Sequence, residues 1–373
     1  MKLNANQVER LFAERREDLD YMLATSMCDG FDIKDLLGMA DDECLEVWKS
    51  LKLGEMNYAV SKKLRETIAR RYRKIKPENL VEVSPEEGVL IALNTMLDPG
   101  DEVIVMEPVM PQLREIPRAI GCKIIPWRLD PTEWGWKLDI DFLENTISSN
   151  TKLIVLNFPN NPTGCLPSEG QLQHIAQIAD GVGCRIFCEE SLRGVEHDPA
   201  GMIPQMADIY DRAVSLSSLR RNGFAALGLG WLATRDAALL LDFHAYKDFT
   251  SHCPNPMSEA LGLMFFRNIQ SITLRNKKII DHNLKLAEGY FKNCPGLFEW
   301  TPPDAGWTAF PKLDARYDSY DFCMSAVEDA KLMLVPDRFY SVNMNRFRIG
   351  YGRRDFGASL VKLSDFADRY ARH

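Results

Sequence analysis

Apolar and polar positions along this chain recur at the spacings typical of helices and strands. Residues 61–74, SKKLRETIARRYRK, carry apolar side chains four residues apart, which predicts an amphipathic helix with a basic outer face. The Ser-Pro-Glu-Glu sequence at 84–87 has the form of a capping box with proline at the first helical position. A second helix is therefore expected over 88–97. A third, longer helix is expected from about Ser258 to Phe291.

Short apolar runs alternate with these helical segments. The runs are EVIVME, CKIIPWRL, KLIVLNF, CRIFCEE, RAVSLSS and GLGWLAT. Strands that alternate with helices predict a mainly parallel sheet between two helical layers, with the functional loops at the carboxyl ends of the strands. The strand-like LFEWT, GWTAFPKL, LMLVP and RFRIGYG near the end of the chain suggest a smaller α+β unit. The fold class is thus α/β, with an N-terminal segment over 1–50, a large domain over 51–280 and a small domain over 281–373.

Composition narrows the class of protein. Of 373 residues, 46% are hydrophobic and 26% are charged, and no run approaches the roughly 20 apolar residues that span a membrane. A net charge of −8 argues against nucleic acid as a partner. The nine cysteines are scattered and lack C-x-x-C spacing, and the histidines lack metal-ligand spacing, so neither disulfides nor a metal site are expected. The first residues lack the apolar stretch of a signal peptide, which predicts a cytoplasmic protein.

Several longer phrases together resemble the class I/II aminotransferases, a family with the fold type I architecture of pyridoxal-phosphate enzymes. These phrases are LDPGDEVIVMEP, KLIVLNFPNNPTG, FCEESLRGVE, SLSSLRRNGFAALGLGWLATRD and RFRIGYG, in the order and at the separations of that family. LKLG and the P-E-E-G turn are similar to the branch that includes capreomycidine synthase-like proteins. The resemblance implies a large domain with a mainly parallel sheet, a smaller α+β domain and a homodimer.

The resemblance also locates the lysine that forms a Schiff base with pyridoxal phosphate in this family. It follows an S-x-S strand, a segment that here reads SLSSLRRNG, so the lysine position is occupied by Arg220 or Arg221. A guanidinium remains protonated and does not replace an amine as an imine former. We therefore expect that Schiff-base chemistry is lost and that the chain takes no cofactor.

Other cofactor positions implied by the resemblance are changed as well. The phosphate-binding arginine corresponds to Gly228, and the aspartate that pairs with the pyridinium corresponds to Glu189. The remaining altered positions are Leu192 for a tyrosine, Met110 for the stacking aromatic residue, Glu55 for the tyrosine that reaches the partner's phosphate, and Glu86 in the helix turn that faces the phosphate. A carboxylate at either of the last two positions would repel a phosphate.

Two positions of the family survive. Asn161 follows an apolar strand and is expected to contact the cofactor ring oxygen, although it could instead only cap its own turn. Arg348 is expected to bind a substrate carboxylate through two parallel hydrogen bonds, or else to form a surface ion pair. Arg220 and Arg221 either enter the vacated pocket and bind an anion or turn to solvent, and Glu189 is expected to pair with one of them.

Three functions remain open from the sequence. The first is a family member that has lost Schiff-base chemistry and binds an amino-acid-like or other carboxylate or anionic ligand, with or without a catalytic chemistry that does not use pyridoxal phosphate. The second is an active pyridoxal-phosphate aminotransferase or cyclase that uses a displaced lysine such as Lys247. The third is a non-catalytic partner subunit of an active paralogue.

Overall fold

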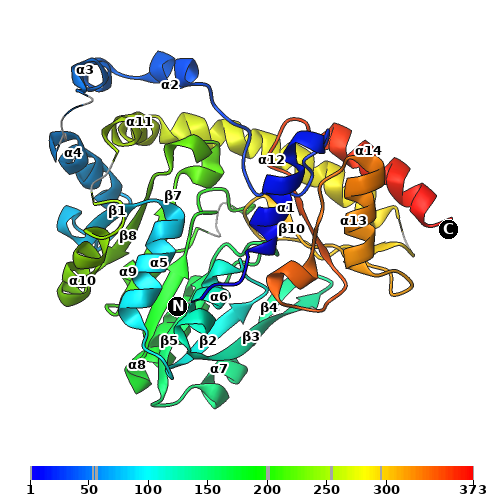
Figure 1. Ribbon diagram of the computed structural model, residues 1–373, viewed down its shortest axis with the longest axis horizontal. Helices are drawn as coiled ribbons and strands as arrows, with labels where there is room; N and C mark the ends of the chain where they lie inside the picture. The colour runs from blue at the N-terminus through cyan, green and yellow to red at the C-terminus, as the bar shows by residue number, and fades with distance from the viewer. Residues whose placement is uncertain are drawn as a thin grey trace.

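The computed structural model of the protein describes residues 2–52, 54, 58–198, 202–252, 255–294 and 296–372. An eight-stranded sheet forms its centre, in the order β1-β8-β7-β6-β5-β2-β3-β4 (Figure 1). The strands are β1 (Leu80–Val83), β2 (Glu102–Glu107), β3 (Lys123–Thr132), β4 (Gly135–Leu138), β5 (Thr151–Asn157), β6 (Arg185–Glu189), β7 (Ala213–Ser218) and β8 (Gly230–Thr234).

The middle of this sheet is parallel. β3, β2, β5, β6 and β7 pair with one another in parallel, whereas β1, β8 and β4 join antiparallel at the two sides. The expected α/β architecture with a mainly parallel sheet is confirmed. Because β5, β6 and β7 are parallel neighbours, their carboxyl ends meet at one edge of the sheet, where folds of this class bind ligands.

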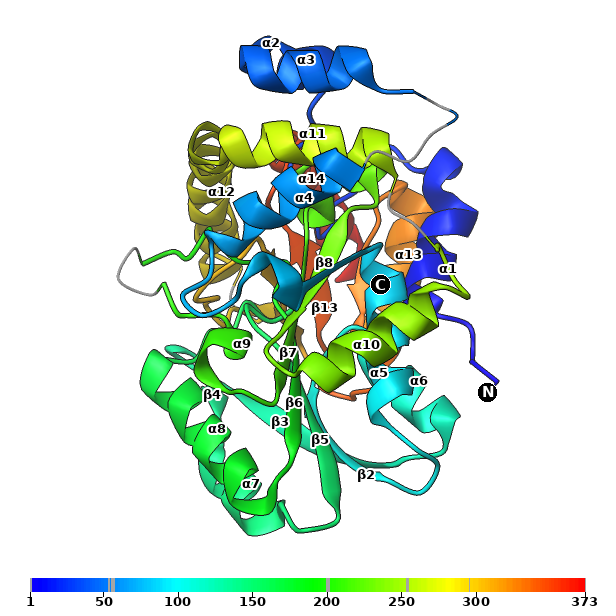
Figure 2. The ribbon, with the colours of Figure 1, turned by 90° about the vertical axis from the view of Figure 1, so that its left-hand side faces the viewer.

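Helices cover both faces of the sheet. Along β2, Val103 and Val105 belong to one apolar cluster together with residues of α5, α6 and α10, while Ile104 and Met106 belong to another together with residues of α7 and α8. Alternate strand residues point to opposite faces, so a strand buried on both sides is apolar throughout. Figure 2 shows α7, α8 and α9 on one side of the sheet and α5, α6 and α10 on the other. The helices concerned are α5 (Pro85–Met96), α6 (Gln112–Ile120), α7 (Ile140–Thr146), α8 (Glu169–Val182), α9 (Met206–Ile209) and α10 (Ala237–Lys247).

The sequence signals for helix ends were reliable where they were local. α5 begins at Pro85, and the backbone N–H of Ser84 donates to the Glu87 carboxylate at 3.0 Å, as the capping box predicts. By contrast, the helix expected over 61–74 is α4, Tyr58–Ala69, which ends five residues earlier.

The prediction of a single helix between Ser258 and Phe291 is wrong. Two helices, α11 (Pro256–Arg267) and α12 (Ile269–Lys292), meet at Asn268. Asn268 has φ −111° and ψ 13°, and its side-chain amide donates to the Met264 carbonyl at 2.9 Å. That local hydrogen bond competes with helix continuation and ends α11.

A smaller unit lies beyond α12. Its three-stranded sheet has the order β10-β13-β12, and a separate pair joins β11 to β9. The strands are β9 (Phe298–Glu299), β10 (Thr308–Ala309), β11 (Lys312–Leu313), β12 (Val335–Pro336) and β13 (Phe347–Gly350). The remaining helices are α1 (Gln7–Arg15), α2 (Ile33–Met39), α3 (Asp42–Ser50), α13 (Ser319–Ala330) and α14 (Phe356–Tyr370). Among the described helices, none is long and apolar enough to cross a membrane.

Candidate functional site

Three polar side chains mark the edge where β5 and β6 end. Asn157, the last residue of β5, accepts the backbone N–H of Asn161 at 2.8 Å through its Oδ1. Its amide donates to the Glu189 carboxylate, at the end of β6, at 2.6 Å. All three side chains are buried. Asn157 therefore holds Asn161 and Glu189 in fixed positions at the ligand-binding edge of the sheet.

Arg348 lies opposite this edge, on β13 of the smaller unit. Its side chain is 1% exposed, its Nε donates to the Ala24 carbonyl at 2.9 Å, and its Nη1 donates to Asn161 Oδ1 at 3.2 Å. Burial lowers its pKa. No carboxylate of the described residues lies within 4.0 Å of it. Arg348 is therefore a buried cation with no carboxylate in contact, although the charge of Glu9 acts on it from farther away, and the expected surface ion pair is not formed.

Asn161 has one group left over. Its Oδ1 accepts from Arg348, but its buried Nδ2 has no hydrogen-bond partner among the described residues. Buried polar groups in proteins are nearly always paired, so a free donor of this kind indicates a missing acceptor. The structure thus brings Asn161 and Arg348 together, 187 positions apart in the sequence, with one donor that lacks a partner and one cation that lacks a carboxylate in contact.

Tyr340 belongs to the same group of residues, although no motif in the sequence pointed to it. The guanidinium carbon of Arg348 lies 5.8 Å from its ring centroid, and its buried hydroxyl has no partner in the described part of the chain. Burial raises its pKa to about 12, against the opposing effect of Arg348 and Arg221. Tyr340 is therefore a neutral hydroxyl donor beside two cations.

The two arginines at the predicted lysine position lie in the turn Arg220–Asn222 after β7 and go separate ways. Arg220 forms an ion pair with Glu86, in the first turn of α5. Its pKa is lowered by burial first and by the nearby Arg221 second. Arg221 instead donates to the Ser26 hydroxyl. Neither arginine turns simply to solvent.

A small cavity, here called the strand-end cavity, lies between Glu86, Met110, Glu189, Ser218, Arg220 and Arg221. Its volume is about 20 Å³, which leaves room for about one water molecule. Glu189 lines it but forms no ion pair with either arginine; its carboxylate accepts instead from Asn157 and, at 3.1 Å, from the Ser191 backbone N–H. The expected pairing of Glu189 with an arginine is therefore wrong.

The other changed positions lie in three different environments. Met110 is buried, with its sulfur 3.8 Å from Arg348 Nη1. Leu192 is fully buried in the apolar core of the smaller unit, and Gly228 is exposed in a turn at φ 55°. Glu55 lies outside the described residues.

Lys247, the candidate displaced lysine, lies close to the same helix end. It is 6% exposed, and its ammonium donates to the Ser251 hydroxyl at 2.5 Å and lies 3.8 Å from Glu87 Oε2 in the first turn of α5. It is not among the residues that line the strand-end cavity. Glu87 holds it in the position observed.

The described residues also contain no group of three or more histidine, cysteine and acidic side chains that could hold a metal ion.

Comparisons with known proteins identify relatives over most of the chain. The profile of the family described as aminotransferase class I and II matches residues 53–355. Capreomycidine synthase of Streptomyces vinaceus is 26% identical over 290 residues, which are 77% of this chain and 73% of that protein. A probable N-acetyl-LL-diaminopimelate aminotransferase of Bacillus subtilis strain 168 is 27% identical over 305 residues, 78% and 72% of the two chains. The predicted likeness to capreomycidine synthase is thereby confirmed.

Solved structures share the fold over nearly the full length. A PLP-dependent aminotransferase from Streptococcus suis 89-1591 superimposes with a TM-score of 0.90 at 24% identity, covering 99% of both chains. The PLP-dependent cyclase OrfR superimposes with a TM-score of 0.88 at 22% identity, covering 99% of this chain and 98% of that one. The match to a family with such members overturns the prediction that the chain takes no cofactor. The loss of Schiff-base chemistry stays a prediction.

Proposed function

This chain belongs to the class I and II aminotransferases, and we propose that it binds pyridoxal phosphate reversibly and holds the carboxylate of an amino or oxo acid at Arg348. When bound, the cofactor supplies an electron sink for bonds at the α-carbon of an amino acid. In this proposal, covalent attachment through a lysine at the end of β7 is absent, because arginines follow that strand.

Several residues would hold the cofactor. The carboxylate of Glu189 would pair with the ring nitrogen, and the free Nδ2 donor of Asn161 would meet a ring oxygen. The backbone N–H groups at the start of α5 would face the phosphate, since a helix N-terminus favours an anion. The free Asn161 donor is the feature of this structure that supports such a ligand.

The strand-end cavity opposes covalent attachment of the cofactor. A volume of about 20 Å³ does not accept a pyridine ring until Arg220 and Arg221 move, and no lysine is among the described residues that line it. Movement is feasible for Arg220, because its partner Glu86 is 56% exposed and can be solvated separately. In this proposal, pyridoxal phosphate enters and leaves the site in competition with the Arg220–Glu86 ion pair.

The environment of Arg348 is the observation that supports a carboxylate as the substrate group. A buried guanidinium with no carboxylate in contact is costly, and an anion that accepts its hydrogen bonds would offset that cost. The neighbouring hydroxyl of Tyr340 and amide of Asn161 are donors without partners, as a carboxylate or ring oxygen would need. The geometry of a planar guanidinium matches a carboxylate.

A second candidate is an active enzyme in which Lys247 acts as the displaced lysine. Its buried ammonium reaches the first turn of α5, where the family binds the cofactor's phosphate. For this function Lys247 would have to leave Glu87 and Ser251 and become deprotonated at the cofactor.

A single experiment separates the two candidates. The purified protein is titrated with pyridoxal phosphate while its absorbance spectrum is recorded, then reduced with borohydride and mapped by peptide mass spectrometry. Reversible binding predicts a saturable spectral change, full release on dialysis and no reduced lysine. A reduced adduct on Lys247 that disappears in Lys247→Met, but persists when the exposed Lys285 is changed to Met, would establish the second candidate instead. No saturable change would refute both.

A further inference from the structure

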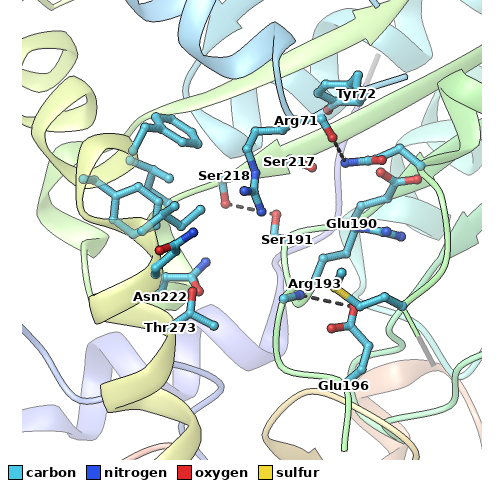
Figure 3. A pocket seen from close by; sticks show the side chains of 18 of the residues that line it. Arg71, Tyr72, Glu190, Ser191, Arg193, Glu196, Ser217, Ser218, Asn222 and Thr273 are labelled. Atoms are coloured by element: carbon cyan, nitrogen blue, oxygen red, sulfur yellow. Dashed lines mark hydrogen bonds between the residues drawn. The ribbon is translucent and has the colours of Figure 1, made fainter. Parts of the chain in front are cut away.

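A much larger cavity adjoins the strand-end cavity. This α12 cavity has a volume of about 580 Å³, within the range of about 300–1,000 Å³ typical of small-molecule sites. Figure 3 shows it between α12, which carries Thr273, and the loop after β6, which carries Glu190, Arg193 and Glu196. Ser218 and Ser191 line both cavities, and their hydroxyls are hydrogen-bonded at 3.0 Å. The α12 cavity is therefore a neighbour of the family's site with walls of its own.

One wall of the α12 cavity is aromatic. It is lined by Tyr72, Trp231, Phe265 and Phe266. The rings of Trp231 and Phe266 pack edge to face, with 5.6 Å between their centroids. The indole N–H of Trp231 donates to the Tyr72 hydroxyl at 2.8 Å. Since the indole N–H is satisfied in this way, the wall presents mostly apolar ring surface to the cavity, and a flat apolar body would pack against it.

Cations outnumber carboxylates around the rest of the α12 cavity. Arg71, Arg73, Arg193 and Lys277 line it, against Glu190 and Glu196. Arg73 is 3.6 Å from Glu169 and Lys277 is 2.9 Å from Asp281. In the described part of the chain, no carboxylate lies within 4.0 Å of Arg71 or Arg193. The Arg193 guanidinium donates to the carbonyls of Ile203 and Pro204.

The two carboxylates offset only part of this charge. Burial raises the pKa of Glu190 to about 7, so its charge is only partly developed at neutral pH. Glu196 is buried and accepts the Gly194 backbone N–H at 3.3 Å. Arg71 enters the cavity from the side opposite Arg193 in Figure 3, toward Ser191 and Ser218. Charge of one sign within a cavity attracts ligands of the other sign.

We propose that the α12 cavity is a second ligand site, distinct from the family's cofactor site, for a small organic anion with an aromatic body. The aromatic wall receives the ring and Arg71 faces the anionic group. This assignment is independent of the function proposed above, because none of the residues that hold the cofactor or the carboxylate there, Asn161, Glu189 and Arg348, lines this cavity.

The test uses a matched pair of fluorescent probes, anionic 8-anilinonaphthalene-1-sulfonate and its uncharged analogue N-phenyl-1-naphthylamine. Each is titrated into the full-length protein with and without saturating pyridoxal phosphate. The variants are Thr273→Trp, which fills the cavity from α12, and Arg71→Gln, which removes the cation. The control is Arg70→Gln, a change at the adjacent exposed residue that does not line the cavity. Circular dichroism confirms that each variant is folded.

Specific results are expected. The anionic probe should bind more tightly than the neutral one and should persist in saturating pyridoxal phosphate. Thr273→Trp should weaken it at least about ten-fold and Arg71→Gln about five-fold, the effect of losing one partly solvated charge interaction. Arg70→Gln should leave it unchanged. The proposal is overturned if the wild-type protein binds neither probe, if both bind equally, if pyridoxal phosphate displaces the anion, or if folded Thr273→Trp binds as the wild type does.

Discussion

The buried carboxyl of Glu190 makes the stability of this protein depend on pH, and the change Glu190→Gln tests that. Glu190 is 2% exposed; its Oε1 accepts the Met206 backbone N–H at 2.8 Å and the Ser215 hydroxyl at 3.1 Å, and its Oε2 has no partner among the described residues. Burial raises its pKa from 4.5 to about 7, against the opposing charge of Arg193. The folded protein therefore retains a proton that the unfolded chain releases at a lower pH.

The sign and size of the effect follow from that shift. The stabilisation is fully present below pH 4.5 and is lost as the pH rises through about 7, because the unfolded state ionises first. At 1.36 kcal/mol per pKa unit, the loss is about 3 kcal/mol. Glutamine keeps the Oε1 acceptor and cannot ionise. The free energy of unfolding of Glu190→Gln, taken relative to that of the wild type, should therefore be about 3 kcal/mol higher at pH 8 than at pH 4.5.

Urea unfolding monitored by circular dichroism at pH 4.5, 6 and 8 measures this difference. Glu133→Gln, a change at an exposed carboxylate, is the control. Its difference in stability from the wild type should be the same at every pH. Glu259, whose pKa burial also raises to about 7, remains in the variant, so part of the wild-type pH dependence should persist. If the stability difference between Glu190→Gln and wild type is constant from pH 4.5 to 8, the reasoning from burial is refuted.

Three further changes probe the site and its frame. Arg220→Lys should create a borohydride-reducible pyridoxal-phosphate adduct on the peptide that contains residue 220; its absence by mass spectrometry would exclude that position as the equivalent of the family's lysine. Arg348→Lys keeps the charge but loses a charge-assisted hydrogen bond worth about 1.5–3 kcal/mol, so calorimetric affinity for an oxo acid that the wild type binds should fall about ten-fold or more, and an unchanged affinity would place the carboxylate elsewhere. Gly350→Ala should lower the free energy of unfolding by several kcal/mol, about 3 or more by analogy with overpacked sites, since its Cβ would meet the Thr25 carbonyl oxygen at 1.7 Å. Gly357→Ala in α14, where the nearest atom is 3.8 Å away, is the matched control and should be neutral or stabilising by up to about 1 kcal/mol; equal effects in urea unfolding would contradict this packing.

The sequence by itself determined those features that depend on near neighbours. The capping box at Ser84 fixed the start of α5, and apolar runs separated by helices fixed a mainly parallel sheet. The polar turn after β5 placed Asn161 at the ligand-binding edge. Hydrogen bonds three residues apart and strand periodicity are local, so they can be read without knowledge of the rest of the chain. The end of α4 and the break at Asn268 escaped this reading, because a helical pattern does not show where another hydrogen bond ends the helix.

Tertiary structure decided the chemistry of the site. The sequence left Arg220 and Arg221 equivalent, whereas the fold directs Arg220 to Glu86, 134 positions away, and Arg221 to Ser26, 195 positions away. It also brings Arg348 to Asn161 with no carboxylate in contact, and it leaves the Tyr340 hydroxyl unpaired among the described residues. The changed lysine, phosphate-arginine and aromatic positions together led to the wrong expectation of no cofactor, which the match to the family overturned. Partners distant in the chain, burial and free hydrogen-bonding groups exist only once the chain has folded, and these determine which ligands a pocket can hold.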